Sequence, residues 1–412
     1  MKLWAALTSA SAFITLVLAA DAPITNANVA ADLVVRDRFI VKYKDGTGAS
    51  AKTAHENTIN TQSKSANKKG VIAKINLSGL EGYVVDLDAD GLKQLRSSGI
   101  VEYLEKDTVV NATDLEQSAA ANEKLRRAAV TQNSAPWNLG RISHKEKGSS
   151  DYVYDSTAGV GARVYVIGTG VLITHTEFNG RASYGANFVP GSPNTDELGY
   201  GTSVASIVGG RTVGVAKRAT IISVKVLDKN GGGSISGIIQ AINWIVADAV
   251  SRGVARKSVI AMMAGGSYSA ALNAAVLAST NAGLTFVAGS GSSDSDANGF
   301  SPASAPTCLT VAAIDGLDRR TAASNWGQSV DIFAPGMTIL SAYIGSNTAM
   351  RYLTGTTMAA PHVAGLAAYF IAKENLNGHP AVSNRILSVA VTGKVVDPKG
   401  SNNRIAYNGS GK

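Results

Sequence analysis

Short apolar runs rich in β-branched residues recur along the C-terminal two thirds of the chain. They cover residues 164–167, 221–227, 259–263, 284–288 and 309–313, and segments with helical patterning separate several of them. Short continuous apolar runs with intervening helices are typical of buried parallel strands joined by crossover helices. The pattern predicts an α/β fold whose central, mostly parallel sheet is flanked by helices.

Residues 38–110 show a different, α+β pattern. The run RFIVKYKDG from Arg38 has strand character, and further strands are expected at 83–87 and 100–104, with a short helix at 91–98. We therefore expect a small separate domain at 38–110, a polar linker at 111–127 and a large domain at 128–412.

The first twenty residues have the pattern of a secretory signal. Lys2 gives a positive start, residues 3–18 are apolar, and Ala19 and Ala20 are small residues suited to cleavage. Polar Thr and Ser residues interrupt the apolar run, so a membrane anchor is less favoured, and no later run is long enough to span a membrane. We expect a secreted, extracellular protein with a signal peptide at 1–20.

Composition narrows the function classes. The chain has 412 residues, 45% of them hydrophobic and 17% charged, which is enough to bury a large core. The formal charge of +8 comes from scattered Lys and Arg residues without a basic stripe, so nucleic-acid binding is not expected. The single cysteine, Cys308, excludes an intrachain disulfide.

The segment 355–365, GTTMAAPHVAG, carries the chemistry of interest. It resembles the GTSMATPHVAG segment of subtilisin-like serine proteases, and of the proteinase K branch in particular. The resemblance covers most of the chain from about Ala128. It implies a subtilisin-like domain, and it places Thr357 where the family has its nucleophilic serine.

Three further segments resemble the family in order along the chain, and each differs at its chemical position. VYVIGTGVLITHTEF places Gly168 at the aspartate, GYGTSVAS places Tyr200 at the general base, and TFVAGSGS places Ser290 at the oxyanion asparagine. A hydroxyl is a poor nucleophile unless a base takes its proton, and the base needs an acid to orient it. On subtilisin itself, losing a triad member costs about 10⁴ to 10⁶ in turnover. The resemblance therefore implies a fold whose peptide-cutting machinery is absent.

Each of these positions can also be explained by a structural role without any chemistry. Tyr200 is more typical of a core or cleft aromatic residue than of a base, and Ser290 of a bonded loop hydroxyl. The GTG at 168–170 is not a dinucleotide loop, because Ile173 stands where a third glycine is required. None of the five histidines is an obvious replacement base: His55, His144, His175, His362 and His379.

The two segments that line the family's peptide cleft can also be located in this sequence. Residues 231–244 resemble the edge segment that precedes a long helix and helps to bind extended substrate, with Gly231, Gly232 and Gly233 at its start. Opposite, the family's Ser-Leu-Gly-Gly run is replaced by Met263, Ala264, Gly265 and Gly266. Met263 either changes the specificity pocket or fills the core.

The N-terminal domain, which ends in GIVEYLEKD, is similar to the inhibitory propeptide of this family, and residues 129–137 resemble the family's mature start. Arg126 and Arg127 precede that start within a polar linker. We expect cleavage in trans after Arg127 by a dibasic-specific protease, or no cleavage. The alternative is that the two arginines only solvate the linker.

The resemblance also implies a structural calcium site, in which Pro306 and Cys308 would contribute main-chain carbonyls and Asp331 a carboxylate. Three N-x-Ser/Thr triplets, at Asn76, Asn111 and Asn408, are candidate glycosylation sites in a secreted chain.

The leading hypothesis is a secreted pseudoprotease that holds its own propeptide, or a peptide or protein ligand, without cutting it, as a decoy, inhibitor or regulator. One alternative is a weak endopeptidase that uses Thr357 with an unrecognised base. Another is an extracellular structural role.

Overall fold

The structure is a computed structural model that describes residues 21–112, 116–118 and 130–412. The expected signal segment 1–20 and the processing residues Arg126 and Arg127 lie outside the described residues.

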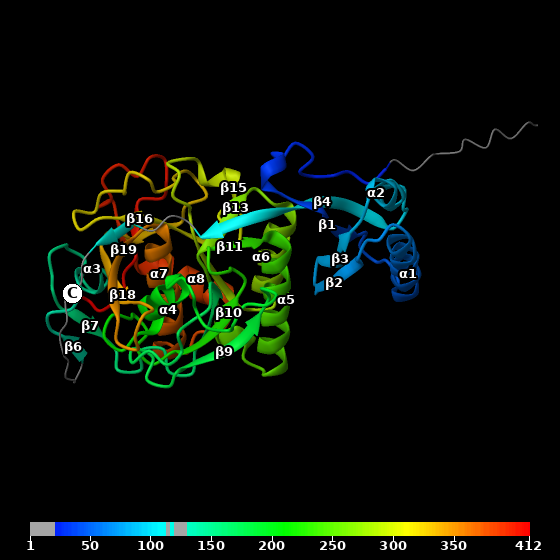
Figure 1. Cartoon of the computed structure of the whole chain (residues 1–412). Helices are drawn as coiled ribbons and strands as arrows, with labels where there is room; N and C mark the ends of the chain where they lie inside the picture. The colour runs from blue at the N-terminus through cyan, green and yellow to red at the C-terminus, as the bar shows by residue number, and fades with distance from the viewer. Residues whose placement is uncertain (1–20, 113–115, 119–129) are drawn as a thin grey trace, which may run out of the picture.

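A nine-stranded sheet forms the centre of the larger unit in the described part of the chain (Figure 1). All neighbouring pairs are parallel except β20 with β21. The five apolar runs correspond to β8, β10, β12, β14 and β16, so the predicted α/β sheet is confirmed. The strand order is β20 (Val391–Thr392), β21 (Arg404–Ile405), β17 (Ile332–Pro335), β16 (Leu309–Ile314), β14 (Thr285–Gly289), β12 (Ser258–Met262), β8 (Arg163–Gly168), β10 (Thr220–Lys225) and β9 (Ala182–Asn187).

Helices cover both faces of this sheet. α4 (Tyr200–Gly209) and the buried α7 (Thr356–Lys373) share a core with Val164 and Val166 of β8. α5 (Ile235–Ser251) and α6 (Ala270–Asn281) share another with Tyr165 and Ile167. Successive residues of one strand therefore enter two cores, which explains why the central strands are continuously apolar. The shorter α3 (Trp137–Ser143) and α8 (His379–Val389) complete the helices of this unit.

The N-terminal residues form a separate lobe with its own hydrophobic core. It contains the 3₁₀ turn Ala31–Leu33, β1 (Val34–Tyr43), α1 (Ala49–Ser65), β2 (Gly70–Leu77), β3 (Leu80–Asp86), α2 (Ala89–Arg96) and β4 (Val101–Ala112). Its strands lie in the order β4, β1, β3, β2. The expected α+β fold is confirmed, although neither α1, whose sequence is largely polar, nor β2 was anticipated.

β4 joins the lobe to the larger unit (Figure 1). Its first half pairs with β1, and its second half lies between β11 (Gly232–Ser234) and β13 (Ala264–Ser267), antiparallel to both. Asn111 pairs with Gly232 on one side and Gly265 on the other. Residues 111 and 112, expected in the linker, therefore belong to this strand.

The remaining elements are short strands and 3₁₀ turns outside the nine-stranded sheet. β15 (Phe300–Ser301) extends the β13 edge, and β6 (Val130–Gln132) pairs with β7 (Tyr152–Tyr154). β18 (Ile339–Ala342), β19 (Met350–Thr354) and β5 (Glu116–Ser118) form a small sheet just before α7. Single 3₁₀ turns lie at Ala255–Lys257 and Ala297–Gly299. Within the described ranges, no helix is both long and apolar enough to cross a membrane.

Candidate functional site

Thr357 lies in the first turn of α7. The preceding Gly355 has φ 146°, a backbone conformation that a residue with a side chain rarely adopts, so the chain turns sharply into the helix here. The Thr357 side chain is 2% exposed, and its hydroxyl has no hydrogen-bond partner among the described residues. No described side chain is therefore hydrogen-bonded to this hydroxyl as a base would be.

Gly168 ends β8 and leaves room beside α4. The nearest atoms to a Cβ built at this position are Gly201 Cα and Tyr200 Cδ1, both at 3.8 Å. By contrast, a Cβ on Gly170 would lie 2.8 Å from the Thr195 carbonyl oxygen, and Gly170 has φ 102°. The backbone requires glycine at 170 but not at 168, so the missing carboxylate is not a steric consequence of the fold.

Tyr200 begins α4 and is completely buried. Its phenol donates a hydrogen bond to the Met263 carbonyl oxygen, just beyond the end of β12. The hydroxyl is therefore engaged by a main-chain acceptor across the site. Its ring fills the space next to Gly168 as an ordinary core aromatic.

The nearby carboxylate of Asp196 is not a substitute acid. Its Oδ1 accepts hydrogen bonds from the Gly199 amide at 2.8 Å and from the Thr169 hydroxyl at 2.7 Å. Its Oδ2 accepts from the Thr202 amide at 2.8 Å and from the Thr202 hydroxyl at 2.7 Å. The carboxylate is buried and its acceptor positions serve the start of α4, where negative charge is favourable.

Ser290 is held within its loop. Its hydroxyl donates to the Asn325 carbonyl oxygen at 3.2 Å, while Asn325 Nδ2 donates to the Ser290 carbonyl at 3.0 Å. Asn325 Oδ1 also accepts from the Ser293 amide at 2.8 Å. The Ser290 proton is therefore used inside the protein, as expected for a bonded loop hydroxyl.

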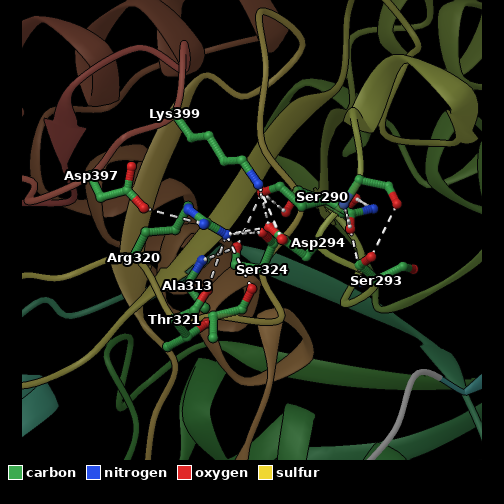
Figure 2. A network of polar contacts seen from close by, with 12 residues as sticks. Ser290, Ser293, Asp294, Ala313, Arg320, Thr321, Ser324, Asp397 and Lys399 are labelled. Atoms are coloured by element: carbon green, nitrogen blue, oxygen red, sulfur yellow. Dashed lines mark hydrogen bonds and ion pairs between the residues drawn. The ribbon is translucent and has the colours of Figure 1, made fainter.

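Ion pairs fix the outer part of this loop (Figure 2). Asp294 contacts Arg320 at 3.0 Å and Lys399 at 2.9 Å, and Arg320 also contacts Asp397 at 3.3 Å. Lys399 Nζ lies 4.6 Å from the centre of the Trp326 ring. These contacts tie the loop that carries Ser290 to the C-terminal segment, so the loop is well supported.

No histidine supplies the missing base. Among the described residues, the His362 ring is hydrogen-bonded to Asn138 Nδ2 at 2.8 Å and to the Met358 carbonyl at 2.9 Å, and burial lowers the pKa of His362 to about 4. Burial also lowers the pKa of His175, which contacts the Ala349 carbonyl. Within the described ranges, none of the five histidines is hydrogen-bonded to Thr357: His55, His144, His175, His362 and His379.

A cavity of about 350 Å³ lies beside Thr357. Met263, Gly265 and Ser290 line it from the larger unit, and Asn111 and Ala112 line it from β4. Met263 is 2% exposed and packs in the core, so it both fills the interior and contacts the cavity.

The predicted cleft residues make the backbone contacts that hold β4. The Ala112 amide donates to the Gly231 carbonyl at 2.9 Å, and Gly232 and Gly233 pair with Asn111 and Val110. On the opposite edge, Ala264 pairs with Ala112. The chain's own strand therefore occupies the groove in which an extended peptide would lie.

Two carboxylates of β4 cap the helices next to this groove, and the sequence analysis missed both. Asp107 accepts from the Ser236 amide at 2.9 Å and from the Ser236 hydroxyl at 2.6 Å, at the start of α5. Glu105 accepts from the Ser269 hydroxyl and from the Ala271 amide, at the start of α6. Burial raises the pKa of each carboxyl despite these bonds. The sequence signal for this role was the presence of two acidic residues in a segment with the pattern of a buried strand.

The proposed calcium ligands lie around the start of β16. Asp331 Oδ2 accepts from the Thr310 amide at 2.9 Å, and burial raises the pKa of Asp331 to about 6. Burial also raises the pKa of the Cys308 thiol to about 12, so the thiol is neutral and only the carbonyl of Cys308 is a suitable ligand. A partly buried carboxylate whose charge is disfavoured fits a cation neighbour, with Pro306 and Cys308 supplying carbonyl oxygens. No group of three or more His, Cys, Asp or Glu residues with metal-binding geometry exists in the described part of the chain.

The three glycosylation triplets have different surroundings. Asn76 and Asn111 are exposed. Asn408 is completely buried, and its Nδ2 donates to the Val153 carbonyl at 2.7 Å. The fold therefore does not support the expectation of a surface site at Asn408, since its amide nitrogen is inaccessible.

Comparisons with known proteins agree with this architecture. Residues 159–407 match the family described as "Subtilase family", and residues 38–113 match "Peptidase inhibitor I9". The chain is 43% identical to "Subtilisin-like protease 2" of Pseudogymnoascus destructans, over 98% of this chain and 97% of that protein. It is 38% identical to "Alkaline protease 1" of Aspergillus clavatus, over 92% of each. The crystal structure of a cold adapted subtilisin-like serine proteinase matches with a TM-score of 0.63 at 36% identity, covering 67% of this chain and 99% of that one.

Proposed function

The chain belongs to the subtilase family, and we propose that it keeps the family's peptide-binding groove without the family's hydrolytic chemistry. The observation that carries this proposal is the Thr357 hydroxyl, which is buried and has no hydrogen-bond partner among the described residues. Without a base, a threonine hydroxyl is a poor nucleophile at neutral pH. Gly168, Tyr200 and Ser290 supply neither the acid, the base nor the oxyanion amide.

The function left to the groove is binding of an extended polypeptide. β11 and β13 offer main-chain donors and acceptors on both sides of β4, and this mode of recognition depends on backbone geometry more than on side chains. In the uncut chain the ligand is the protein's own N-terminal lobe. After release of that lobe, a peptide or protein segment would take its place, so the protein would act as a decoy, inhibitor or regulator.

Labelling with a hydroxyl-directed fluorophosphonate tests inactivity. Purified protein should remain unlabelled at Thr357 under conditions that label an active subtilase fully. With a casein or peptide library as substrate, Thr357→Ala and the wild type should show the same background rate of hydrolysis. Stoichiometric labelling at Thr357, or activity that Thr357→Ala abolishes, would support the alternative of a weak endopeptidase.

The same proposal predicts how the chain is cut between its N-terminal lobe and its larger domain. A chain that cannot cut itself needs a second protease, and we propose that cleavage occurs in trans after Arg127 or does not occur. N-terminal sequencing of protein made in cells with and without a dibasic-specific protease tests this. An Ala128 start that persists without that protease, and that appears when the purified chain refolds alone, would show self-cleavage.

We also propose a secreted protein with a structural calcium ion held by Asp331 and by the carbonyl groups of Pro306 and Cys308. The ion would neutralise the partly buried Asp331 carboxylate and so stabilise the loop that joins β14 to β16.

A further inference from the structure

The triplet at Asn111 lies on the cleft strand itself. Asn111 is exposed on β4, while its neighbour Val110 is 1% exposed and packs in the core. Its backbone pairs with Gly232 and Gly265, but its side-chain amide forms no hydrogen bond with any described residue. The strand therefore holds Asn111 by its main chain and leaves its Nδ2 free and accessible.

The other two triplets provide internal controls. Asn76 is exposed near the end of β2 in the N-terminal lobe, where its main-chain amide donates to Asn243 Oδ1 of α5 at 3.0 Å. Asn408 is completely buried and its Nδ2 is bonded to the Val153 carbonyl. A folded molecule can therefore carry a glycan at Asn76 or Asn111 but not at Asn408.

We propose that Asn111 carries an N-linked glycan that protects the cleft strand from cutting by other proteases. In the attachment step, Asn111 Nδ2 attacks the anomeric carbon of a lipid-pyrophosphate-linked oligosaccharide. A C–N bond forms, the C–O bond to the pyrophosphate breaks, a proton leaves Nδ2, and the lipid pyrophosphate departs. The donor is a glycolipid of the secretory pathway.

The position of Asn111 gives the glycan its effect. A protease binds its substrate as an extended segment of several residues. Any protease that cuts close to Ala112 must therefore accommodate Asn111 in its own cleft, where a branched oligosaccharide does not fit. Arg126 and Arg127 lie about fifteen residues further along the chain, beyond this steric block. The glycan thus directs processing to the dibasic pair and leaves β4 intact.

This inference rests on the proposed function in one respect. A chain that does not cut itself has no need of a bare peptide segment in the groove, so a bulky group on Asn111 interferes with no reaction of its own. The two ideas can fail separately, because glycan occupancy and sensitivity to an added protease are measured without reference to hydrolysis by this protein.

The test uses the full chain secreted from a eukaryotic host. Glycopeptide mass spectrometry should find Asn111 occupied and Asn408 bare. Limited proteolysis with a broad-specificity protease should cut between residues 108 and 116 at least about tenfold faster in Asn111→Gln and in Thr113→Ala than in the wild type. Asn76→Gln should leave that rate unchanged.

Thr113→Ala keeps the asparagine and removes only the acceptor triplet, so it separates loss of the glycan from loss of the side chain. Enzymatic removal of glycans from the folded wild type should also expose the same bonds, and this guards against a folding defect in either variant. A bare Asn111 in the secreted wild type, or equal cutting with and without the glycan, would overturn the proposal.

Discussion

The start of α7 and the groove around β4 differ in whether their function depends on side chains or on the main chain. At the start of α7 the backbone turns sharply, with Gly355 at φ 146°, but under the proposed function the side chains needed for hydrolysis are absent. In the groove, β11 and β13 still hold a strand from both sides. Catalysis depends on a few side chains acting together, whereas strand binding depends on main-chain groups that every residue supplies. A fold can therefore lose the first function and retain the second.

Restoring the side chains should give the largest effect. Gly168→Asp, Tyr200→His, Ser290→Asn and Thr357→Ser together should raise peptide hydrolysis by about 10³-fold or more, because triad residues act as a unit. A Cβ at 168 has no neighbour closer than 3.8 Å, so the carboxylate has room at its base. Turnover of a fluorogenic peptide measures the gain.

The single substitutions are the matched controls, and each should leave the rate near background. A folded quadruple variant without activity would contradict the idea that only these side chains are missing. It would direct attention to the pocket around Met263.

Breaking the strand contact should give the second-largest effect. Val110 is 1% exposed and faces Gly233 and Gly266 across the groove. Val110→Asp would bury a carboxylate there and weaken retention of the N-terminal lobe by roughly 10²-fold. The dissociation rate can be measured after cutting a specific protease site placed in the linker at 121–127.

Asn111→Asp, made in a host that adds no glycans, introduces the same charge at the exposed neighbouring position. It should change the dissociation rate by less than about threefold, since the exposed carboxylate stays in water. Equal effects of the two variants would mean that packing of β4 does not hold the lobe.

The sequence predicted the sheet well because its strands are buried on both faces. The runs at β8, β10 and β12 are continuously apolar, and this signal does not depend on distant contacts. Motif spacing also located Gly168, Tyr200, Ser290 and Thr357, and the loss of hydrolytic chemistry at these positions stays a prediction. It did not predict α1, whose residues are mostly polar and exposed, and whose stability comes from packing on β2.

The extent of β4 was also missed, for a different physical reason. Asn111 and Ala112 are not strongly strand-forming, and a polar stretch follows them, so local pattern indicated a linker. Their conformation is imposed by β11 and β13, which lie more than a hundred residues away in the sequence. The capping roles of Glu105 and Asp107 depend on the same distant contacts.

Calcium should have a moderate effect on stability. The pKa of Asp331 is raised to about 6, so the folded protein binds a proton that the unfolded chain releases near pH 4. Without calcium, the free energy of unfolding should therefore fall as pH rises from about 4 to about 6, by on the order of 3 kcal/mol. Calcium should recover this loss at pH 7 and raise the melting temperature by several degrees.

Asp331→Asn removes the charge and retains an acceptor for the Thr310 amide. The variant should be more stable than the wild type at pH 7 in the presence of a chelator, and its melting temperature should not respond to calcium. A calcium response that survives in Asp331→Asn would place the ion elsewhere.

The smallest expected effect concerns pH and retention of the lobe. Glu105 and Asp107 are 1% and 0% exposed in the groove, and burial raises the pKa of both above their ordinary values, which we expect to return when release of the lobe exposes them to water. Association therefore takes up protons, so the cut lobe should bind several-fold more tightly at pH 5 than at pH 7. The gain should end below about pH 4, where the free carboxyls are also protonated. The groups that face them are the hydroxyls of Thr25, Ser236 and Ser269, the amides of Ser236 and Ala271, and Arg38 at 3.7 Å from Asp107.

Dissociation rates of the cut lobe between pH 5 and pH 7.5 test this, again with the protease site in the linker. Glu105→Gln combined with Asp107→Asn should flatten the profile, because the two groups that bind protons on association are then neutral throughout. Glu81→Gln alters an exposed carboxylate of the same lobe and should leave the profile unchanged. Burial also lowers the pKa of His55, whose protonation would destabilise the lobe at acid pH, so the lobe's own stability must be followed in parallel. Faster release at pH 5 from a lobe that remains folded would show that the caps favour the charged carboxylates, and the groove would then hold its strand by electrostatics as well as by backbone pairing.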